Sequence, residues 1–276
     1  MRLADQTLVV SVLHGMDWEA SPARASVQAA GDRLFTLVWS NGKAALPEKS
    51  ALVDPREDGR NPGVGPRYLW AANLAAERGD RFLLLLDQDF QAPSDWWSAY
   101  EQAVAAEPLL ACWAPEIRSE GVRLSPFAVR RGRPRRGQPL PAGPLEAASH
   151  AAINSGLLIR VEALLSASRE LTAMPLDFSD YGLFHRLGRS NARIGRVDLS
   201  LEHSLSSREP ASTERRLERF SWFCRGARAW AMLDPSHRWP VRRWSLGRAL
   251  LLCLCSGLDV RFLSAWNVHF RKEERP

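Results

Sequence analysis

The chain has 276 residues, 45% of them hydrophobic, which suffices for one large globular core with a helical appendage and excludes disorder throughout. The formal net charge is +6, and almost all of the basic residues are arginine. A basic surface attracts nucleic acid, anionic lipid or phosphorylated small molecules alike, so charge alone selects no partner. No apolar run approaches the roughly 20 residues of a membrane span, the N-terminus lacks the features of a signal peptide, and the four cysteines have no metal-ligand spacing. These observations predict a cytoplasmic protein with buried thiols and no segment that crosses a membrane.

Short apolar runs bounded by polar or turn residues are predicted to be buried strands. In chain order these runs are residues 7–13, 34–39, 82–86, 109–114, 157–161 and 193–199. Segments of helical composition lie among them at residues 21–30, 66–78, 94–106 and 180–187. Ser94 is the expected N-cap of the third helix, because it follows a proline and precedes an acid. Alternating strands and helices predict an α/β fold with a Rossmann-like, mostly parallel central sheet flanked by helices.

The chain divides into two parts by composition. Residues 1–212 carry the alternating pattern, and residues 213–276 are helical and arginine-rich, so we expect them to pack on the first part as an extension. Within the first part, residues 119–148 are predicted to form a flexible basic loop, because the stretch at 130–144 is rich in arginine, proline and glycine. That loop is either a solvated insertion or a flap over a phosphorylated or lipid-linked substrate.

Two acids follow directly on the leucine-rich strand in RFLLLLDQDF, residues 81–90. Asp87 and Asp89 therefore lie at the carboxyl end of a strand, where open α/β sheets bind ligands. Hard oxygen ligands suit Mg2+ or Mn2+, which shares its remaining positions with substrate phosphates. An Asp-X-Asp pair in isolation is more often a solvated loop, so its position on the strand is what makes it a candidate.

The same stretch, read with NPGVGPRYLWAANLAA at residues 61–76, resembles the family 2 glycosyltransferases of the GT-A fold, and most closely their rhamnosyltransferase-like branch. INSGLLI, LDFSDYGLFHRL and LEHSLS continue the resemblance in the family order, which then spans residues 7 to about 206. The resemblance implies an inverting, metal-dependent transfer of rhamnose or another hexose. The donor would be a nucleotide-diphosphate sugar, and the acceptor a saccharide or lipid-linked molecule in cell-surface polysaccharide synthesis.

The resemblance also implies roles for individual residues. Asp180 is the implied catalytic base that takes the proton of the acceptor hydroxyl. The implied ligands of Mn2+ or Mg2+ are Asp89, Asp87 and His203. The residues implied to bind the nucleotide sugar are Ser11, His14, Ser40, Asn41, Asn61, Asn73, Asp87 and Gln88. Those implied to contact the acceptor or support the base are Ser155, Gly156, Asp177 and Arg186.

Each assignment has a structural alternative. Asp180 suits the N-cap of the helix that it begins. Asn61 and Asn73 suit side-chain hydrogen bonds that fix nearby backbone, and His203 suits a polar position at a strand end. The chain also departs from the family pattern at Ser40, where the family has an Asp that commonly binds the nucleotide base. That departure motivates an alternative function, a catalytically impaired GT-A-like binding or scaffold protein.

The arginines and tryptophans after residue 212 allow two further interpretations. Arginine with exposed aromatic rings stacks on nucleic-acid bases, but no recognised nucleic-acid module is present, so we expect no nucleic-acid partner. The same pairing suits peripheral contact with an anionic membrane, at its inner face for a cytoplasmic protein.

Overall fold

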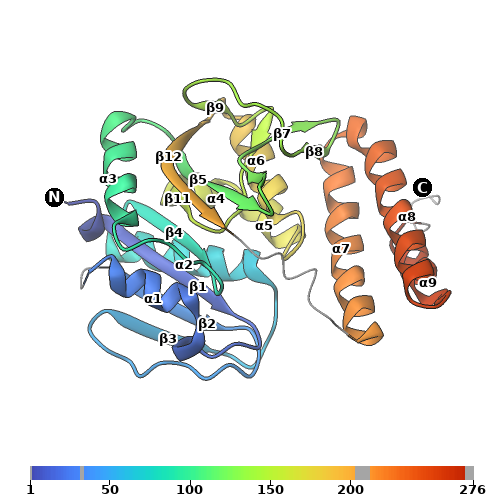
Figure 1. The fold of residues 1–276 in the computed structure, drawn as a ribbon, viewed down its shortest axis with the longest axis horizontal. Helices are drawn as coiled ribbons and strands as arrows, with labels where there is room; N and C mark the ends of the chain where they lie inside the picture. Colours follow the sequence, from blue (N-terminus) through green and yellow to red (C-terminus); the bar gives the residue numbers. More distant parts are fainter. Residues whose placement is uncertain (1, 32–33, 203–211, 271–276) are drawn as a thin grey trace.

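The computed structural model describes residues 2–31, 34–202 and 212–270, and a nine-stranded sheet lies at the centre of this part of the chain (Figure 1). The strand order is β3-β2-β1-β4-β11-β5-β12-β9, with β6 paired to β5. The strands are β1 Thr7–Leu13, β2 Phe35–Ser40, β3 Val53–Glu57, β4 Phe82–Asp87, β5 Cys112–Ser119, β6 Val122–Ser125, β9 Leu145–Glu146, β11 Leu157–Arg160 and β12 Arg193–Glu202. β1 to β4 run parallel, as do β5 and β12, whereas β11 runs antiparallel to both of its neighbours. The predicted mostly parallel sheet is thus confirmed.

The sheet buries both of its faces, because side chains alternate along each strand. Leu83 and Leu85 on β4 join one apolar core together with residues of α2, α4, α5 and α6. Leu84 and Leu86 join a second core with residues of α1 and α3. These helices are α1 Pro22–Ala29, α2 Val64–Arg78, α3 Trp96–Ala106, α4 Val161–Ser166, α5 Ser168–Ala173 and α6 Ser179–Gly188. A strand buried on both faces reads as an uninterrupted run of leucines, as β4 does.

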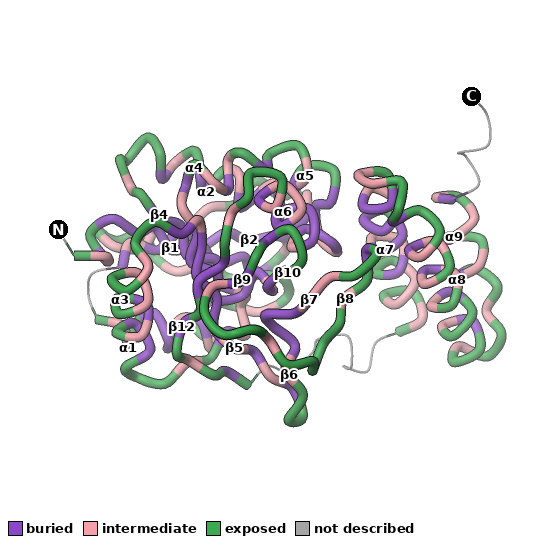
Figure 2. Tube along the Cα trace, turned by 90° about the horizontal axis from the view of Figure 1, so that it is seen from above, coloured by how far each residue is buried: buried purple, intermediate pink, exposed green. Residues whose placement is uncertain are grey.

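Three helices stand together at one end of the molecule, beyond α6 (Figures 1 and 2). They are α7 Thr213–Leu233, α8 Arg238–Cys255 and α9 Arg261–Phe270. Their packing continues the core of the sheet, since the ring of Phe223 on α7 lies 5.3 Å from that of Phe178. No helix in the described ranges has the length and apolar character needed to cross a bilayer. Cys255 is exposed and the other three cysteines are buried, so the prediction of buried thiols is wrong for Cys255.

Residues 119–148, predicted to form a flexible loop, instead contain β6, β9 and a hairpin of β7 Phe127–Arg130 and β8 Arg133–Arg135. The hairpin pairs with β10 His150–Ala151 in a three-stranded sheet. Its turn is anchored on α7, where Trp230 Nε1 donates to the Gly132 carbonyl over 2.9 Å. The prediction failed because strand pairing satisfies the backbone, a few apolar side chains such as Phe127 and Leu145 are buried in the core, and the anchoring tryptophan is almost 100 residues away in the sequence.

Several element boundaries also differ from the predictions. β3 was missed because it contains Pro55 and alternating charges, a composition tolerated on the edge strand that it forms. The strand predicted at 109–114 starts later and runs further, as β5. Ser94 is not an N-cap, because α3 starts at Trp96 with Asp95 before it and no side-chain cap.

Candidate functional site

Asp87 ends β4 on the face of the sheet that α2 and α6 cover. Leu83 and Leu85 belong to the core on that face, and side chains two residues apart on a strand point the same way. Tyr68 of α2 is buried there. Burial raises the pKa of its phenol well above the usual value, and the carboxylates of Asp87 and, more weakly, Asp180 raise it further. A side-chain hydrogen bond with Asp87 also contributes to the raised pKa of the Tyr68 phenol. Tyr68 therefore marks a point where Asp87 and Asp180 converge.

Asp180 lies inside the first turn of α6, and its Oδ1 accepts a hydrogen bond from the Tyr181 amide over 2.9 Å. The N-cap position belongs to Phe178, whose φ of 68° is left-handed, so the N-cap alternative for Asp180 is wrong. Burial of the carboxyl group raises its pKa to about 7, against the opposing effects of the Tyr181 amide and the Arg136 guanidinium. Asp180 can therefore exchange a proton near neutral pH.

Asp177, three residues earlier, is tied to the C-terminal helices. Its Oδ1 lies 3.1 Å from a guanidinium nitrogen of Arg219 on α7. Its Oδ2 is buried and has no hydrogen-bond partner among the described residues. Burial raises the pKa of the carboxyl group, and the charges of Arg219 and Arg248 lower it. The ion pair joins the segment that carries Asp180 to α7.

Two glycines let neighbouring helices approach this segment closely. The Gly65 amide at the start of α2 donates to the Pro175 carbonyl over 2.9 Å, and a Cβ at Gly65 would lie 2.4 Å from the Leu171 carbonyl oxygen. A Cβ at Gly226 on α7 would lie 2.3 Å from the Asp177 carbonyl oxygen. Both distances are shorter than a side chain tolerates, so α2 and α7 hold the segment between them. Sequence reasoning missed Gly226, because nothing near it in the sequence signals the contact.

The turn before β11 brings the predicted residues Ser155 and Gly156 to the end of β4. The Gly156 amide donates to the Leu85 carbonyl over 2.8 Å, while its own carbonyl accepts from the Tyr100 hydroxyl. Ser155 is buried. Asn154 Nδ2 donates to Ser179 Oγ over 3.0 Å, immediately before Asp180. The turn thereby fixes the start of α6 relative to the strand that carries Asp87.

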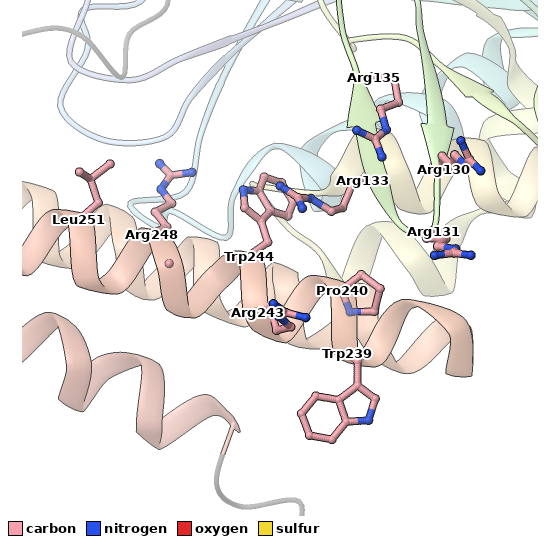
Figure 3. Close-up of a pocket in the computed structure, with 11 residues that line it drawn as sticks. Arg130, Arg131, Arg133, Arg135, Trp239, Pro240, Arg243, Trp244, Arg248 and Leu251 are labelled. Atoms are coloured by element: carbon pink, nitrogen blue, oxygen red, sulfur yellow. The ribbon is translucent and has the colours of Figure 1, made fainter.

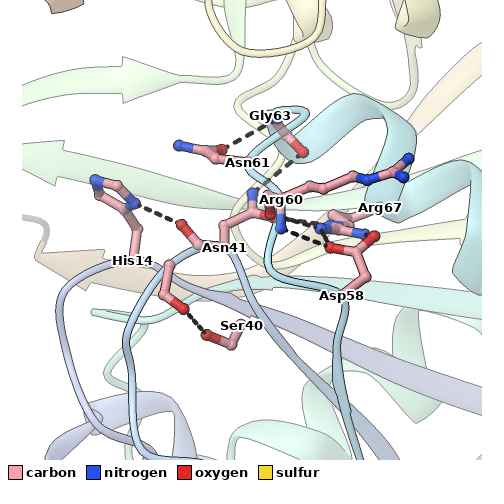
Figure 4. Close-up of polar contacts among 9 residues, drawn as sticks. His14, Ser40, Asn41, Asp58, Arg60, Asn61, Gly63 and Arg67 are labelled. Atoms are coloured by element: carbon pink, nitrogen blue, oxygen red, sulfur yellow. Dashed lines mark hydrogen bonds and ion pairs between the residues drawn. The ribbon is translucent and has the colours of Figure 1, made fainter.

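Predicted nucleotide-binding residues join the ends of β1, β2 and β4, and Figure 4 shows the contact between His14 and Asn41. The His14 amide donates to Gln88 Oε1 over 2.7 Å, and Gln88 Nε2 donates to the His14 carbonyl over 3.3 Å. His14 Nδ1 lies 3.0 Å from the Asn41 carbonyl oxygen, and the tautomer of the ring decides whether it donates. The structure thus brings His14, Asn41 and Gln88 together, as expected for residues at adjacent strand ends.

Behind these residues lies a buried arginine that the sequence did not reveal (Figure 4). Arg67 Nε donates to Asn41 Oδ1 over 2.7 Å, and its guanidinium pairs with Asp58 at 2.7 Å and covers the Trp39 ring at 4.1 Å. Arg67 lowers the pKa of Asp58 to about 2. Asn41 Nδ2 donates to the Gly63 carbonyl over 3.2 Å. Both ends of the Asn41 amide are therefore bonded to the protein itself.

Three further predicted residues are also bonded within the fold or buried. Ser11 is fully buried inside β1, two residues before the strand ends. Ser40 is buried, and its hydroxyl donates to the Gly42 carbonyl over 2.9 Å. Asn61 Oδ1 accepts from the Gly63 amide over 3.2 Å, which fixes the loop before α2.

The remaining predicted residues lie away from the cluster or outside the described ranges. Asn73 is exposed on α2, nine residues beyond the helix start, and donates to the Leu69 carbonyl over 2.9 Å. Arg186 Nε donates to the Ser166 carbonyl at the end of α4, over 3.0 Å. The structure therefore does not bring either side chain to Asp87 or Asp180. His203 lies outside the described residues.

Comparison with known proteins identifies the fold. No protein-family model matches the sequence, and no curated protein matches it significantly. Among solved structures, GalNAc-T7 with UDP, GalNAc and Mn2+ is similar at 12% identity and a TM-score of 0.53, over 86% of this chain and 52% of the other. The fold is of the GT-A type. S. aureus TarS 1-349 in complex with UDP-GlcNAc also matches, at 11% identity and a TM-score of 0.49, over 97% of this chain and 80% of the other. The chain spans about half the length of the GalNAc-T7 chain.

A divalent metal is implied by the resemblance of this GT-A chain to family 2, and the described residues supply part of a site for it. Asp87 and Asp89 offer carboxylate oxygens at the end of β4. Within the described ranges, no three or more His, Cys, Asp or Glu side chains gather as a complete metal cage. Mg2+ and Mn2+ bind through one or two carboxylates when substrate phosphates complete the shell. The residues present fit such an ion together with a diphosphate.

Proposed function

We propose that this chain is an inverting glycosyltransferase that uses a nucleotide-diphosphate sugar. The observation that carries the proposal is the place of Asp180, a buried carboxyl group with a pKa of about 7 that converges with Asp87 on Tyr68. A general base works best when its pKa lies near the operating pH. The UDP, GalNAc and Mn2+ in the structure of GalNAc-T7 support a nucleotide-sugar donor and a divalent metal for this fold.

In the proposed reaction an acceptor hydroxyl attacks the anomeric carbon of the sugar. The new carbon–oxygen bond forms while the bond to the diphosphate breaks on the opposite face, and Asp180 takes the hydroxyl proton. Asp87 and Asp89 hold the diphosphate side of the donor, where a bound Mn2+ or Mg2+ would neutralise the charge of the leaving group. His14, Asn41 and Gln88 shape the nucleotide side through the strand ends that they join.

The finer identity of the enzyme also belongs to this proposal. We place the chain in the rhamnosyltransferase-like branch, with rhamnose or another hexose as the sugar and a saccharide or lipid-linked acceptor in cell-surface polysaccharide synthesis. We assign residues 1–212 to the catalytic domain and 213–276 to a helical extension. We place the protein in the cytoplasm, in peripheral contact with the inner face of the membrane.

Release of nucleoside diphosphate from a panel of nucleotide sugars tests the proposal, with Mn2+ and with saccharide and lipid-linked acceptors. Asp180→Asn should abolish release while donor binding, measured by calorimetry, persists. Asp89→Asn should weaken metal-dependent donor binding itself. Asp95→Asn, the same change at an exposed site before α3, is the matched control and should behave as the wild type. Wild-type turnover in both Asp180→Asn and Asp89→Asn would overturn the assigned roles.

A second candidate function is a GT-A-like binding or scaffold protein that no longer transfers sugar. Ser40 and Asn41 favour it, because Ser40 replaces the family Asp and bonds Gly42, while the amide of Asn41 is occupied by Gly63 and Arg67. Calorimetry with UDP, dTDP and GDP in the presence of Mn2+ separates the two candidates. Metal-dependent binding of any of them supports the enzyme, and its absence with all three supports the scaffold.

A further inference from the structure

A groove separates the β7–β8 hairpin from α8 (Figure 3). Its volume is about 900 Å³. Six arginines line this arginine groove: Arg130, Arg131, Arg133 and Arg135 from the hairpin, and Arg243 and Arg248 from α8. Because Trp230 anchors the hairpin turn on α7, these charges stand on a fixed scaffold.

Among the described residues little negative charge balances the arginines of the groove, although the buried carboxyl group of Asp177 interacts electrostatically with Arg248. No acidic residue lines the groove, and its arginines form no ion pair within 4.0 Å there. Arg133 contacts the ring of Trp244, and Arg248 covers the ring of Phe223 at 4.2 Å. Like charges gathered in a cleft create a field that attracts an anion. Guanidinium groups also match the oxygens of a phosphate geometrically.

An apolar surface continues the groove along α8. Leu251 rises from the same side of α8 as Trp244 and Arg248 (Figure 3). Leu254 neighbours Leu251 one turn further along α8, and Leu258 follows just after the helix. Leu251, Leu254 and Leu258 are 60%, 64% and 69% exposed, and we refer to them as the apolar stripe. Adjacent exposed leucines indicate an interaction surface more than isolated ones do.

We propose that the arginine groove and the apolar stripe together dock this chain on an anionic phospholipid membrane. The groove takes lipid phosphate groups, and the stripe enters the boundary between headgroups and acyl chains. Clustered arginines beside exposed apolar residues on a helix are the pattern that binds such surfaces. A small soluble phosphate would use the groove but leave the stripe in water, so the stripe favours a lipid.

Docking in this way would bring the candidate catalytic segment toward the membrane. Arg248 lines the groove and also lowers the pKa of Asp177. Arg136, directly after the groove residue Arg135, lowers the pKa of Asp180. The groove therefore lies close enough to Asp177 and Asp180 to affect their charge. This orientation rests on the proposed transferase activity, whereas membrane docking itself does not and gives the proposed peripheral contact a specific surface.

Sedimentation of the full chain with sucrose-loaded vesicles tests the docking. We expect binding to phosphatidylcholine vesicles that contain phosphatidylglycerol, weaker binding at high salt, and no binding to pure phosphatidylcholine. Arg131→Gln with Arg133→Gln should weaken partitioning about 25-fold, at about five-fold per arginine. Arg189→Gln with Arg196→Gln removes the same charge from exposed residues outside the groove and should not reproduce that loss.

The apolar stripe is tested separately. Leu254→Ser with Leu258→Ser should weaken partitioning about ten-fold or more, because both side chains would leave water on docking. Leu109→Ser, at a leucine 93% exposed elsewhere, is the matched control. A polarity-sensitive dye on Cys255, the one exposed cysteine in the described ranges, should shift to the blue with anionic vesicles and not with inorganic phosphate.

Three results would overturn the proposal. They are failure to sediment with anionic vesicles at low salt, an equal loss in the Arg189 and Arg196 control, and binding of inorganic phosphate or single-stranded RNA through the groove without vesicle binding. Release of nucleoside diphosphate from the nucleotide-sugar donor, measured with soluble acceptors, separates the docking result from the proposed transferase activity. A protein that transfers sugar but ignores vesicles refutes docking alone, and one that docks without transfer refutes the transferase alone.

Discussion

Replacing Asp180 by Asn should stabilise the protein above neutral pH while it abolishes transfer. The folded structure raises the pKa of this carboxyl group from 3.8 to about 7, chiefly by burial. Between these values the folded chain holds a proton that the unfolded chain has lost, so the free energy of unfolding falls as pH rises. Each pKa unit corresponds to about 1.4 kcal/mol, which gives a penalty of about 4 kcal/mol above pH 7. The residue is only partly buried as a whole, so this figure is an upper bound.

Asparagine has no charge to bury. The free energy of unfolding of Asp180→Asn should therefore exceed that of the wild type by an amount that grows as pH rises. Urea unfolding of both proteins at pH 5.5, 6.5, 7.5 and 8.5 measures it. The difference should grow by about 2 kcal/mol from pH 5.5 to pH 7.5 and then stay constant. Asp95→Asn is the control for the chemical change and should show no such trend. A difference that is flat with pH, or that favours aspartate as pH rises, would refute the burial of this carboxyl group.

The remaining predictions concern activity and the contacts around the site. The kcat should rise as pH increases through about 7, because Asp180 loses its proton there and becomes able to act as a base. A kcat that does not rise across this pH range would contradict the role of Asp180 as the base. Gly226→Ala should lower kcat at least about ten-fold with little change in donor Kd, because its Cβ would lie 2.3 Å from the Asp177 carbonyl oxygen. Gly247→Ala, which meets nothing within 4 Å, should keep full activity, and equal effects of the two would exclude a specific contact. Arg67→Met should cost about 2 kcal/mol in urea unfolding, since it loses hydrogen bonds of a buried guanidinium. Asp58→Asn should cost less, because that carboxylate is largely exposed, and the reverse order would contradict the geometry.

The local pattern of apolar and polar residues predicted the central strands and the strand end that carries Asp87. The run Leu83 to Leu86 predicted a buried strand, and the structure has β4 there, buried on both faces. The pattern also placed Asp87 at the end of that strand, because strands have a period of two and end at the first polar turn. Local pattern failed at residues 119–148, where composition suggested a loop, because a hairpin anchored by Trp230 depends on a contact across the fold.

The sequence by itself determined which groups end the strands: Asp87 as the last residue of β4 with Gln88 after it, Asn41 after β2 and His14 after β1. Only the tertiary structure decided how those groups behave. Asp180 has a pKa of about 7 because it is buried where segments distant in the sequence meet. The arginine groove exists because the hairpin that carries Arg130 to Arg135 packs beside α8, more than 100 residues later. Strand ends follow from local periodicity, whereas desolvation and electric field at a group depend on every atom packed around it.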